Sequence, residues 1–247
     1  MSLPPMIDDH PPRLSAAQLD ELRGFTTPTI ANAIELFEVR PRHTGFLPHT
    51  IRALTPHLGV TLGYAVTCRT IAAPPGADFD PITSADRLMA YYRYVAASPG
   101  PKVAVAQDLD DPPGLGAFFG ELNASVHQRL GCVGHVTSGC PRDLGEVEAL
   151  GFALYGLNPC VSHAYIRVES FGEPVVLGGV TIQPGDLIHA DRHGVCVIPR
   201  EIEFRLAEAC REVERAERPL LELCRAETFD LDAYLIERRR MKPGLRE

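Results

Sequence analysis

The stretch 114–143 limits the possible folds of this chain more than any other segment. It begins with a glycine-rich loop that runs directly into a predicted helix. Apolar residues at four-residue spacing predict one buried face for that helix: Leu122, Val126 and Leu130. The apolar run 133–136 predicts a buried strand, and the Thr-Ser-Gly sequence at 137–139 predicts the turn that ends it. The stretch is therefore a helix–strand unit bounded by two loops.

Two features that can bind an anion flank this unit. The first is the set of free N–H groups at the start of the helix, which can hold a carboxylate or a phosphate. These groups belong to Gly120, Glu121, Leu122 and Asn123. The second is Arg142, whose planar guanidinium offers paired donors. Asp143 follows it and can anchor a hard divalent cation. Adjacent opposite charges are common on protein surfaces, so the Arg142–Asp143 pair alone is weak evidence for a binding site. Its position one helix–strand unit after Gly120 is what makes it a candidate.

Charge and apolar patterning argue against two classes of partner. The net charge of the 247-residue chain is −8, and its one basic run, 238–240, fits a solvated helix face. Binding to a nucleic-acid backbone is therefore not expected. No apolar run approaches the ~20 residues needed to span a bilayer, so no membrane association is expected either.

The N-terminus and the cysteines indicate the compartment. Residues 1–13 are polar and proline-rich, lack the apolar core of a secretory signal, and are expected to form a flexible arm. The seven cysteines are scattered, and no C-x-x-C pair occurs. Reduced thiols that pack as small core residues are the natural interpretation. We therefore expect a cytoplasmic protein.

The remaining chain alternates helical and β patterns without a linker or an internal repeat. Helices are predicted at 15–23, with Ser15 as the cap, from 27, at 84–97, at 144–150, from 201 and at 231–241. Strands are predicted at 63–72, 102–107, 152–155 and within 161–198, and segment 39–61 is predicted to be irregular. The helix from 201 carries an apolar stripe: Ile202, Leu206, Cys210, Val213 and Leu220. Pro219 is expected to kink or end this helix, and the last helix to be amphipathic.

Several other constellations could carry chemistry, but a structural explanation is favoured for each. Asp108, Asp110 and Asp111 follow a predicted strand and could bind a metal ion, although a polar turn explains them better. Four of the nine histidines fall in the β-rich part of the chain: His135, His163, His189 and His193. His189 and His193 are four residues apart, but they lie in a predicted strand and turn rather than on the helix that a zinc-protease motif requires. Core and turn histidines are therefore favoured over a zinc site.

The sequence gives little support for a covalent nucleophile or for a nucleotide-binding site. No G-x-S-x-G elbow surrounds Ser138 or Cys140. The glycines at 114, 116 and 120 are too loosely spaced for a dinucleotide fingerprint. No lysine lies in the stretch 114–143, so a Schiff-base aldolase is not supported.

Segment 114–199 resembles the RraA-like family, which includes regulators of ribonuclease E activity and class II aldolases that cleave 4-hydroxy-4-methyl-2-oxoglutarate. The matching blocks are GELNASVHQRLGCVGHVTSGCPRD (120–143), LGGVTIQPGD (177–186) and HADRHGVCVIP (189–199). Weaker similarity lies at 26–34, 63–70 and 227–239. The chain departs from the family pattern at Ser138, where relatives often carry Asp or Asn, and at Pro141, which should stiffen the loop before Arg142.

The resemblance implies an α/β fold in which a layered β-sheet core is flanked by helices, of the swivelling-domain type. It implies a single domain over 14–247, with helical N- and C-terminal extensions. Residues 200–247 would form a C-terminal helical extension that packs on a neighbouring subunit. It also implies a homotrimer or hexamer with active sites between subunits.

The resemblance also implies residue roles. Asp143 would hold Mg²⁺ or Mn²⁺, largely through waters, and Arg142 would contact the keto oxygen of the substrate. The backbone amides from Gly120 through Glu121 and Leu122 to Asn123 would receive its carboxylate. The acidic residue that assists a water would be Glu217 or Glu214 of a neighbouring subunit.

Two hypotheses of function follow. The first is a metal-dependent lyase that cleaves a small 2-oxo acid to pyruvate through an enolate; a protein with this chemistry could also decarboxylate oxaloacetate. The second is a non-catalytic regulatory protein of the ribonuclease-regulator type, with a protein as its partner. Arg142, Asp143 and a glutamate-containing C-terminal helix favour the lyase.

Overall fold

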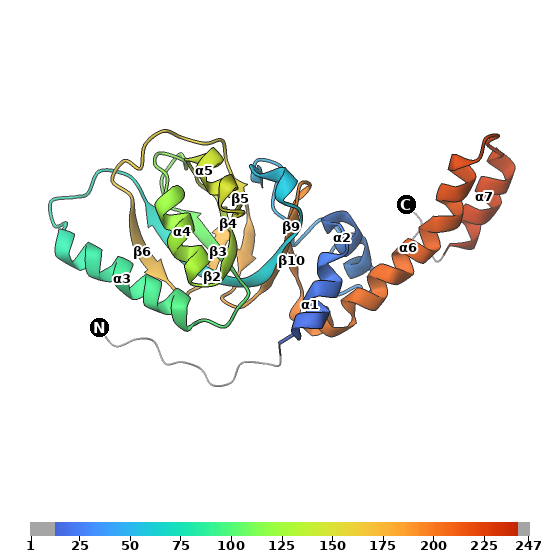
Figure 1. Cartoon of the computed structure of the whole chain (residues 1–247), viewed down its shortest axis with the longest axis horizontal. Coiled ribbons are helices and arrows are strands. Elements are labelled where there is room, and N and C mark those ends of the chain that lie inside the picture. Colours follow the sequence, from blue (N-terminus) through green and yellow to red (C-terminus); the bar gives the residue numbers. More distant parts are fainter. Residues whose placement is uncertain (1–12, 242–247) are drawn as a thin grey trace.

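Four parallel strands form the centre of the sheet in the computed structural model, which describes residues 13–241 (Figure 1). They are β5 (Ala153–Gly156), β4 (Cys132–Thr137), β3 (Lys102–Asp108) and β2 (Thr61–Ile71), in that spatial order. The helix α4 (Glu121–Arg129) connects β3 to β4, and α5 (Leu144–Ala149) connects β4 to β5. The loops 109–120 and 138–143 therefore leave the same carboxyl edge of the sheet, where ligands bind in open α/β folds.

Antiparallel strands extend this centre on both sides. β1 (Arg52–Ala53) pairs with β5, while β9 (Leu187–Asp191) and β10 (Gly194–Ile198) continue the sheet beyond β2. β6 (Arg167–Phe171) pairs with the last residues of β2. β7 (Val175–Leu177) and β8 (Val180–Ile182) form a separate hairpin. The short helix η1 (Pro56–Leu58) lies in the segment predicted to be irregular.

Both faces of the central sheet are buried, and β3 shows why. Val103 and Val105 point into a core shared with β7, β8 and β9, whereas Ala104 and Ala106 point to the opposite core. This alternation follows from the two-residue period of a strand. Helices α3 (Pro81–Ala97), α4 and α5 cover the second face (Figure 1). The structure thus confirms the predicted α/β architecture with a layered sheet flanked by helices.

A third core joins the two ends of the chain. It lies between α1 (Ala16–Arg23), α2 (Thr27–Glu35) and α6 (Glu203–Arg225), which follows η2 (Arg200–Ile202). Ser15 caps α1 in a reciprocal capping box with Gln18, as the sequence predicts for this start. The predicted apolar stripe is confirmed, because Ile202 at the end of η2 and the other four residues on α6 are all buried. Pro219 does not end the helix, which continues to Arg225.

The C-terminal helices project away from the sheet. α7 (Leu231–Arg240) folds back beside the far half of α6, and this pair extends to one side of the molecule (Figure 1). Within the single chain no residue of α7 is buried, so its apolar side chains stay at least partly exposed. Large apolar side chains are exposed along this hairpin: Leu221, Phe229, Leu231, Leu235 and Ile236.

Two local predictions were wrong. Leu122 is 80% exposed, and the buried face of α4 is formed instead by Ala124 and His127. The prediction from apolar spacing was wrong because His127 faces the core instead, where its Nε2 lies 2.9 Å from the hydroxyl oxygen of Tyr91. In the segment predicted as strand from 161, β6 begins only at Arg167. The predicted flexible arm 1–13 lies outside the described residues except for Arg13, and residues 242–247 of the predicted extension are also outside them.

Candidate functional site

The loop after β3 is shaped by two carboxylates. Asp108 accepts hydrogen bonds from the N–H groups of Asp110 and Gly114, at 2.9 and 2.7 Å. Asp110 accepts from the N–H groups of Ala72 and Ala73, at 2.7 and 2.9 Å. These carboxylates are therefore occupied by backbone donors, which supports the polar turn over a metal site. Among residues 13–241, no group of three or more His, Cys, Asp or Glu side chains is placed to hold a metal ion.

The loop ends at Gly120, where α4 begins and meets the Arg142–Asp143 pair. The carboxylate oxygen Oδ2 of Asp143 accepts a 3.0 Å hydrogen bond from the N–H of Glu121. The Nε atom of Arg142 lies 3.5 Å from the same oxygen. The N–H of Arg142 donates to the carbonyl of Phe119 at 2.9 Å. The helix start and the charged pair, separated by a full helix and strand in sequence, are thus adjacent in space.

Gly120 allows this close approach. A Cβ atom at this position would overlap Oδ2 of Asp143 and lie 3.0 Å from Cγ of Arg142. Its backbone is extended, with φ at −137°, so the requirement for glycine here is space rather than backbone freedom. A larger residue would have to push the charged pair away from the helix start.

The site retains unsatisfied hydrogen-bonding groups. Among the described residues, the N–H groups of Leu122 and Asn123 and the Oδ1 atom of Asp143 have no hydrogen-bond partner. The side chains of Arg142 and Asp143 are each about one-third exposed, at 35% and 36%. The site therefore offers two backbone donors, a guanidinium and a free carboxylate oxygen to one ligand, an arrangement suited to a small anion with a cation beside it.

Asp143 adopts a left-handed backbone, with φ at 54° and ψ at 45°. This region is uncommon for residues other than glycine, although aspartate tolerates it better than most. The conformation turns the chain from the loop into α5, whose N-cap is Asp143 itself. Positions of this kind are concentrated at functional sites, which agrees with the other features of this residue.

The loop 138–143 is held from both sides. The Oγ atom of Ser138 accepts the N–H of Asp108 at 2.9 Å, so this departure from the family pattern ties the ends of β3 and β4 together. On the other side, the carbonyl of Pro141 accepts the N–H of Cys160 at 3.0 Å. Pro141 itself is buried.

The side chains of the first turn of α4 face in different directions. Glu121 and Leu122 are exposed. Asn123 is directed into the domain, where its amide donates to the carbonyl of Phe118 and its oxygen accepts from Tyr92, both at 2.5 Å. Asn123 can therefore contribute a backbone N–H to a ligand while its side chain fixes the loop before the helix.

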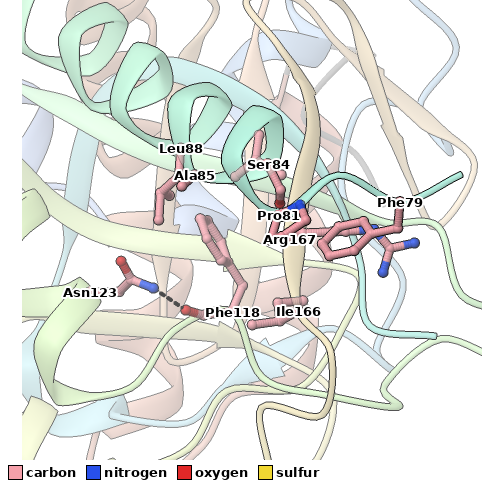
Figure 2. Close-up of a pocket in the computed structure, with 10 residues that line it drawn as sticks. Phe79, Pro81, Ser84, Ala85, Leu88, Phe118, Asn123, Ile166 and Arg167 are labelled. Atoms are coloured by element: carbon pink, nitrogen blue, oxygen red, sulfur yellow. Dashed lines mark hydrogen bonds between the residues drawn. The ribbon is translucent and has the colours of Figure 1, made fainter. Parts of the chain in front are cut away.

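A pocket of about 260 Å³ lies beside Asn123, between α3 and β6 (Figure 2). Its walls are mainly apolar and include Phe79, Leu88, Phe118 and Ile166. Figure 2 shows the amide of Asn123 directed toward the carbonyl of Phe118 at one side of it. The sequence analysis did not identify this pocket, because its residues come from four separate segments.

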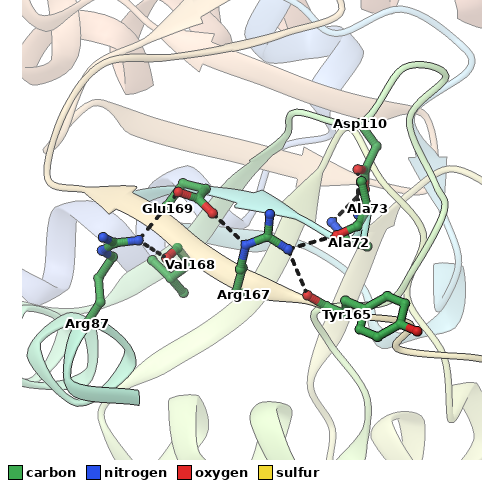
Figure 3. Close-up of polar contacts among 8 residues, drawn as sticks. All are labelled: Ala72, Ala73, Arg87, Asp110, Tyr165, Arg167, Val168 and Glu169. Carbon is green, nitrogen blue, oxygen red and sulfur yellow. Dashed lines mark hydrogen bonds and ion pairs between the residues drawn. The ribbon is translucent and has the colours of Figure 1, made fainter. Parts of the chain in front are cut away.

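Arg167 at the pocket has a structural role. Its Nε donates to Glu169 at 2.8 Å, and Nη1 donates to the carbonyls of Ala73 and Tyr165 at 2.8 and 3.3 Å (Figure 3). Glu169 also pairs with Arg87 of α3 at 3.4 Å. This network joins β6 to α3 and to the end of β2. No pattern in the sequence distinguished Arg167 from other surface arginines.

The histidines are accounted for without zinc. His135 is buried, stacks on Phe119 at a ring distance of 3.6 Å, and contacts the carbonyl of Ala104; burial lowers its pKa to about 3. His189 is buried beside Thr27, and burial lowers its pKa to about 4. His193 lies in a turn against Asp191, and His163 is exposed. All four therefore fit the predicted core and turn roles.

The acidic helper is not part of this site within one chain. Glu217 is half-buried and Glu214 exposed, and both lie on α6, which projects away from α4 and α5 (Figure 1). Lys102 is also remote, at the opposite end of β3, and its ammonium donates to the carbonyl of Val95 at 2.8 Å. A Schiff base at Lys102 would require that buried contact to break.

Comparison with known proteins identifies the family. The RraA-like model, described as Aldolase/RraA, matches residues 27–197. The chain belongs to the RraA-like family. A protein of Halalkalibacterium halodurans named "Putative 4-hydroxy-4-methyl-2-oxoglutarate aldolase" is 28% identical over 132 residues, 53% of this chain and 61% of the relative. An uncharacterized protein of Methanocaldococcus jannaschii is 32% identical over 131 residues, 49% of this chain and 59% of the relative. The match thus spans about 60% of the length of these relatives.

Solved structures confirm the RraA-like fold. An uncharacterized protein from Pseudomonas syringae pv. tomato superposes with a TM-score of 0.72 at 21% identity, over 96% of this chain and 99% of that one. RraAS2 of Streptomyces coelicolor, described as an unusual member of the RNase ES inhibitor RraA protein family, gives 0.67 at 23% identity, over 84% and 96%. The family includes both aldolases and ribonuclease inhibitors by name. Among residues 13–241, no helix is both long and apolar enough to cross a bilayer.

Proposed function

We propose that this protein is a divalent-metal-dependent lyase that cleaves a small 2-oxo acid to pyruvate. The observation that carries the proposal is the meeting of Asp143, Arg142 and the first turn of α4 in one exposed site. A 2-oxo acid presents a carboxylate next to a carbonyl oxygen, and the site presents backbone donors next to a guanidinium. Relatives named as 4-hydroxy-4-methyl-2-oxoglutarate aldolases support the same chemistry.

The residues present fit a Mg²⁺ or Mn²⁺ ion. Oδ2 of Asp143 is oriented by Glu121 and Arg142, while Oδ1 has no partner among the described residues. One oriented carboxylate with waters is a common way to hold Mg²⁺, which retains several waters in proteins. The bound ion would supply Lewis-acid stabilisation of negative charge on the substrate oxygens. Mg²⁺ and Mn²⁺ suit the same oxygen ligands, so either ion is proposed.

Backbone N–H groups, Arg142 and an acidic residue would each have a separate role in the reaction. The N–H groups of Leu122 and Asn123 would bind the substrate carboxylate at the helix start, where the dipole favours an anion. Arg142 would donate to the keto oxygen and stabilise the negative charge that develops there as the C–C bond breaks. Removing one such donor typically slows turnover by about 10²- to 10³-fold. An acidic residue would help a water to take the proton from the 4-hydroxyl group.

We further propose that the acidic residue, Glu217 or Glu214, comes from a neighbouring subunit of a homotrimer or hexamer. The projecting α6–α7 hairpin supports this proposal, because it carries apolar side chains that the single chain leaves exposed. The same arrangement would place an α6 helix of one subunit near the Arg142–Asp143 loop of the next. Decarboxylation of oxaloacetate needs the same charge stabilisation without this base, so it is proposed as a second reaction.

The deciding experiment measures pyruvate release from oxaloacetate and from 4-hydroxy-4-methyl-2-oxoglutarate, with Mg²⁺, with Mn²⁺ and with EDTA. Release that needs either metal and disappears in Asp143→Ala is the expected result. A folded, oligomeric protein that releases no pyruvate from either substrate would overturn the lyase proposal for them. That outcome would favour the regulatory alternative, in which the family fold binds a protein partner without turnover.

A further inference from the structure

Two cysteines lie beside each other in the loops next to the proposed site. The N–H of Leu157 donates to the carbonyl of Gly139 at 2.9 Å, and the N–H of Cys160 donates to the carbonyl of Pro141 at 3.0 Å. These two hydrogen bonds align segment 157–160 with segment 139–141. Cys140 lies between the two bonded positions, so its side chain and that of Cys160 belong to paired backbones.

The two thiols are neighbours and both are accessible. Each of the two cysteines is half-buried, whereas Cys68, Cys132, Cys196 and Cys210 are buried. The pKa of the Cys140 thiol is raised to about 11, mainly by burial and then by the adjacent Cys160 thiol. The Cys160 thiol donates to the carbonyl of Ser162 at 3.3 Å, which holds its side chain within the loop.

A pocket gives small molecules access to Cys140. Its volume is about 430 Å³, and it is lined by residues of three loops and of β1: His49, Thr50, Arg52, Cys140, Leu157 and Asn158. Arg52 donates to Asn158 across this pocket. Cys160 does not line the pocket, but its thiol adjoins that of Cys140. A cationic side chain beside this pair of thiols favours an anionic reagent, such as the peptide disulfide glutathione disulfide.

We propose that Cys140 and Cys160 form a reversible disulfide that controls the position of Arg142. The thiolate of Cys160 attacks one sulfur of a small-molecule disulfide and releases its other half as a thiol. The Cys140 thiol then loses its proton and attacks the Cys160 sulfur, which releases the second thiol. One small-molecule disulfide is reduced to two thiols, and the two cysteines are oxidised to one disulfide.

The bond would act on the site through short connections. Arg142 is two residues after Cys140, and its N–H is bonded to the carbonyl of Phe119. The Sγ atom of Cys140 also lies against Gly114, where a Cβ atom would come within 2.6 Å of it. Moving this sulfur into a disulfide therefore disturbs both the loop that carries Arg142 and the glycine-rich loop that leads to Gly120. Reversible bridges of this kind are the form in which disulfides usually occur in reducing compartments.

The test treats the reduced full-length protein with glutathione disulfide and maps its peptides by mass spectrometry. The expected product is a cross-linked peptide pair containing Cys140 and Cys160, two hydrogens lighter than its parts, which dithiothreitol reverses. Cys140→Ser should instead keep one glutathione on Cys160. Cys224→Ser, which removes an exposed cysteine on α6, is the matched control and should still form the bridge. Glutathione on both Cys140 and Cys160 without a bridge, or modification of Cys224 alone, would overturn the proposal.

A second readout follows Arg142 without relying on lyase activity. Hydrogen exchange of the Arg142 amide should become about tenfold faster in the bridged protein, equivalent to about 1.4 kcal/mol less protection, and should not change in Cys160→Ser treated alike. Unchanged exchange in a fully bridged protein would overturn control of Arg142. Failure of the pyruvate assay would count against the proposed function only, since neither mass nor exchange depends on turnover.

Discussion

The carboxylate of Asp143 accepts a 3.0 Å hydrogen bond from the backbone N–H of Glu121. This bond joins the start of α4 to the loop after β4, and it gives Asp143 two roles. It satisfies one of the free donors at the helix start, as a capping residue would. It also fixes the orientation of a carboxylate whose other oxygen remains available. The two roles can be separated by substitution.

Asp143→Asn should preserve the fold and abolish metal-dependent turnover. The amide oxygen of asparagine can accept the N–H of Glu121, and asparagine tolerates the left-handed backbone that Asp143 adopts. The lost charge, however, removes the proposed ligand for Mg²⁺ or Mn²⁺. We expect pyruvate release to fall at least about 100-fold, with a change in unfolding free energy below about 0.5 kcal/mol. The measurements are the pyruvate assay and urea denaturation.

Asp143→Ala is the matched comparison. It loses the hydrogen bond to Glu121 and places alanine at φ 54°, so we expect a loss of about 1–3 kcal/mol in unfolding free energy. If Asp143→Asn retained wild-type turnover with Mg²⁺, the charge of Asp143 would not be needed and the metal role would be wrong.

Gly120→Ala should reduce activity because its new Cβ would overlap the Asp143 carboxylate and come within 3.0 Å of Arg142. The charged pair would shift away from the α4 N-terminus, and misplacement by about 1 Å can slow an enzyme about 100-fold. Gly145→Ala provides a control in α5, since nothing lies within 4 Å of its Cβ position. We expect Gly145→Ala to retain activity and to gain up to about 1 kcal/mol of stability. Equal activities of the two variants would show that the contact at Gly120 is unimportant.

Glu217→Gln and Asp143→Ala should complement each other if sites form between subunits. Each variant alone lacks one member of the proposed site, Glu217 on α6 or Asp143 after β4. When the two are unfolded together and refolded as mixed oligomers, some interfaces combine an intact Asp143 loop with an intact α6. Pyruvate release should then return to a measurable fraction of the wild-type rate.

The control for this experiment is Glu214→Gln mixed with Asp143→Ala. If Glu217 is the helper, Glu214→Gln alone keeps its activity and the mixture shows only dilution. Recovery in the Glu214 mixture and full activity of Glu217→Gln would assign the role to Glu214. Two inactive variants that never complement would argue that both residues act within one chain, against the remote position of α6 (Figure 1).

The elements that the sequence predicted well are those whose signals are local. Ser15 was predicted to cap its helix because serine is a preferred N-cap residue, and the structure shows its hydroxyl accepting the N–H of Gln18 three residues along the chain. The stripe from Ile202 to Leu220 was identified because one apolar period persists over a long helix. At the site, the glycine before α4 and the charged pair after β4 are recognisable because the family spaces them by one helix–strand unit.

The features that the sequence missed depend on long-range contacts. The sequence predicted Leu122 in the core. His127 faces inward instead, because the hydroxyl group of Tyr91 on α3 provides it with a hydrogen-bond partner. The oxygen of Asp143 that meets Glu121 comes from 22 residues away, and no local rule predicts that bond. The closeness of Cys140 and Cys160 likewise arises from the two backbone bonds between their loops.

Glu203 provides a test of stability against pH. Its side chain is buried at the start of α6, and burial raises its pKa from 4.5 to about 7, against the opposing effect of Arg200 and Arg13. The nearby Asp186 adds to the rise. Because the folded state holds this proton more tightly than the unfolded chain, stability is greatest below about pH 4.5 for this group and falls as pH rises to about 7.

Glu203→Gln should therefore stabilise the protein above pH 7 and have little effect near pH 5. Glutamine keeps the shape of the protonated side chain and never carries the buried charge, so the penalty disappears only where Glu203 would be ionised. Thermal unfolding of both proteins at pH 5 and pH 8 measures the difference, and the buried histidines contribute equally to each. Glu201→Gln, at an exposed position in η2, should change neither midpoint. A lower midpoint for Glu203→Gln at pH 8 would mean that pairing with Arg13 and Arg200 outweighs burial, and the sign of the shift would then be reversed.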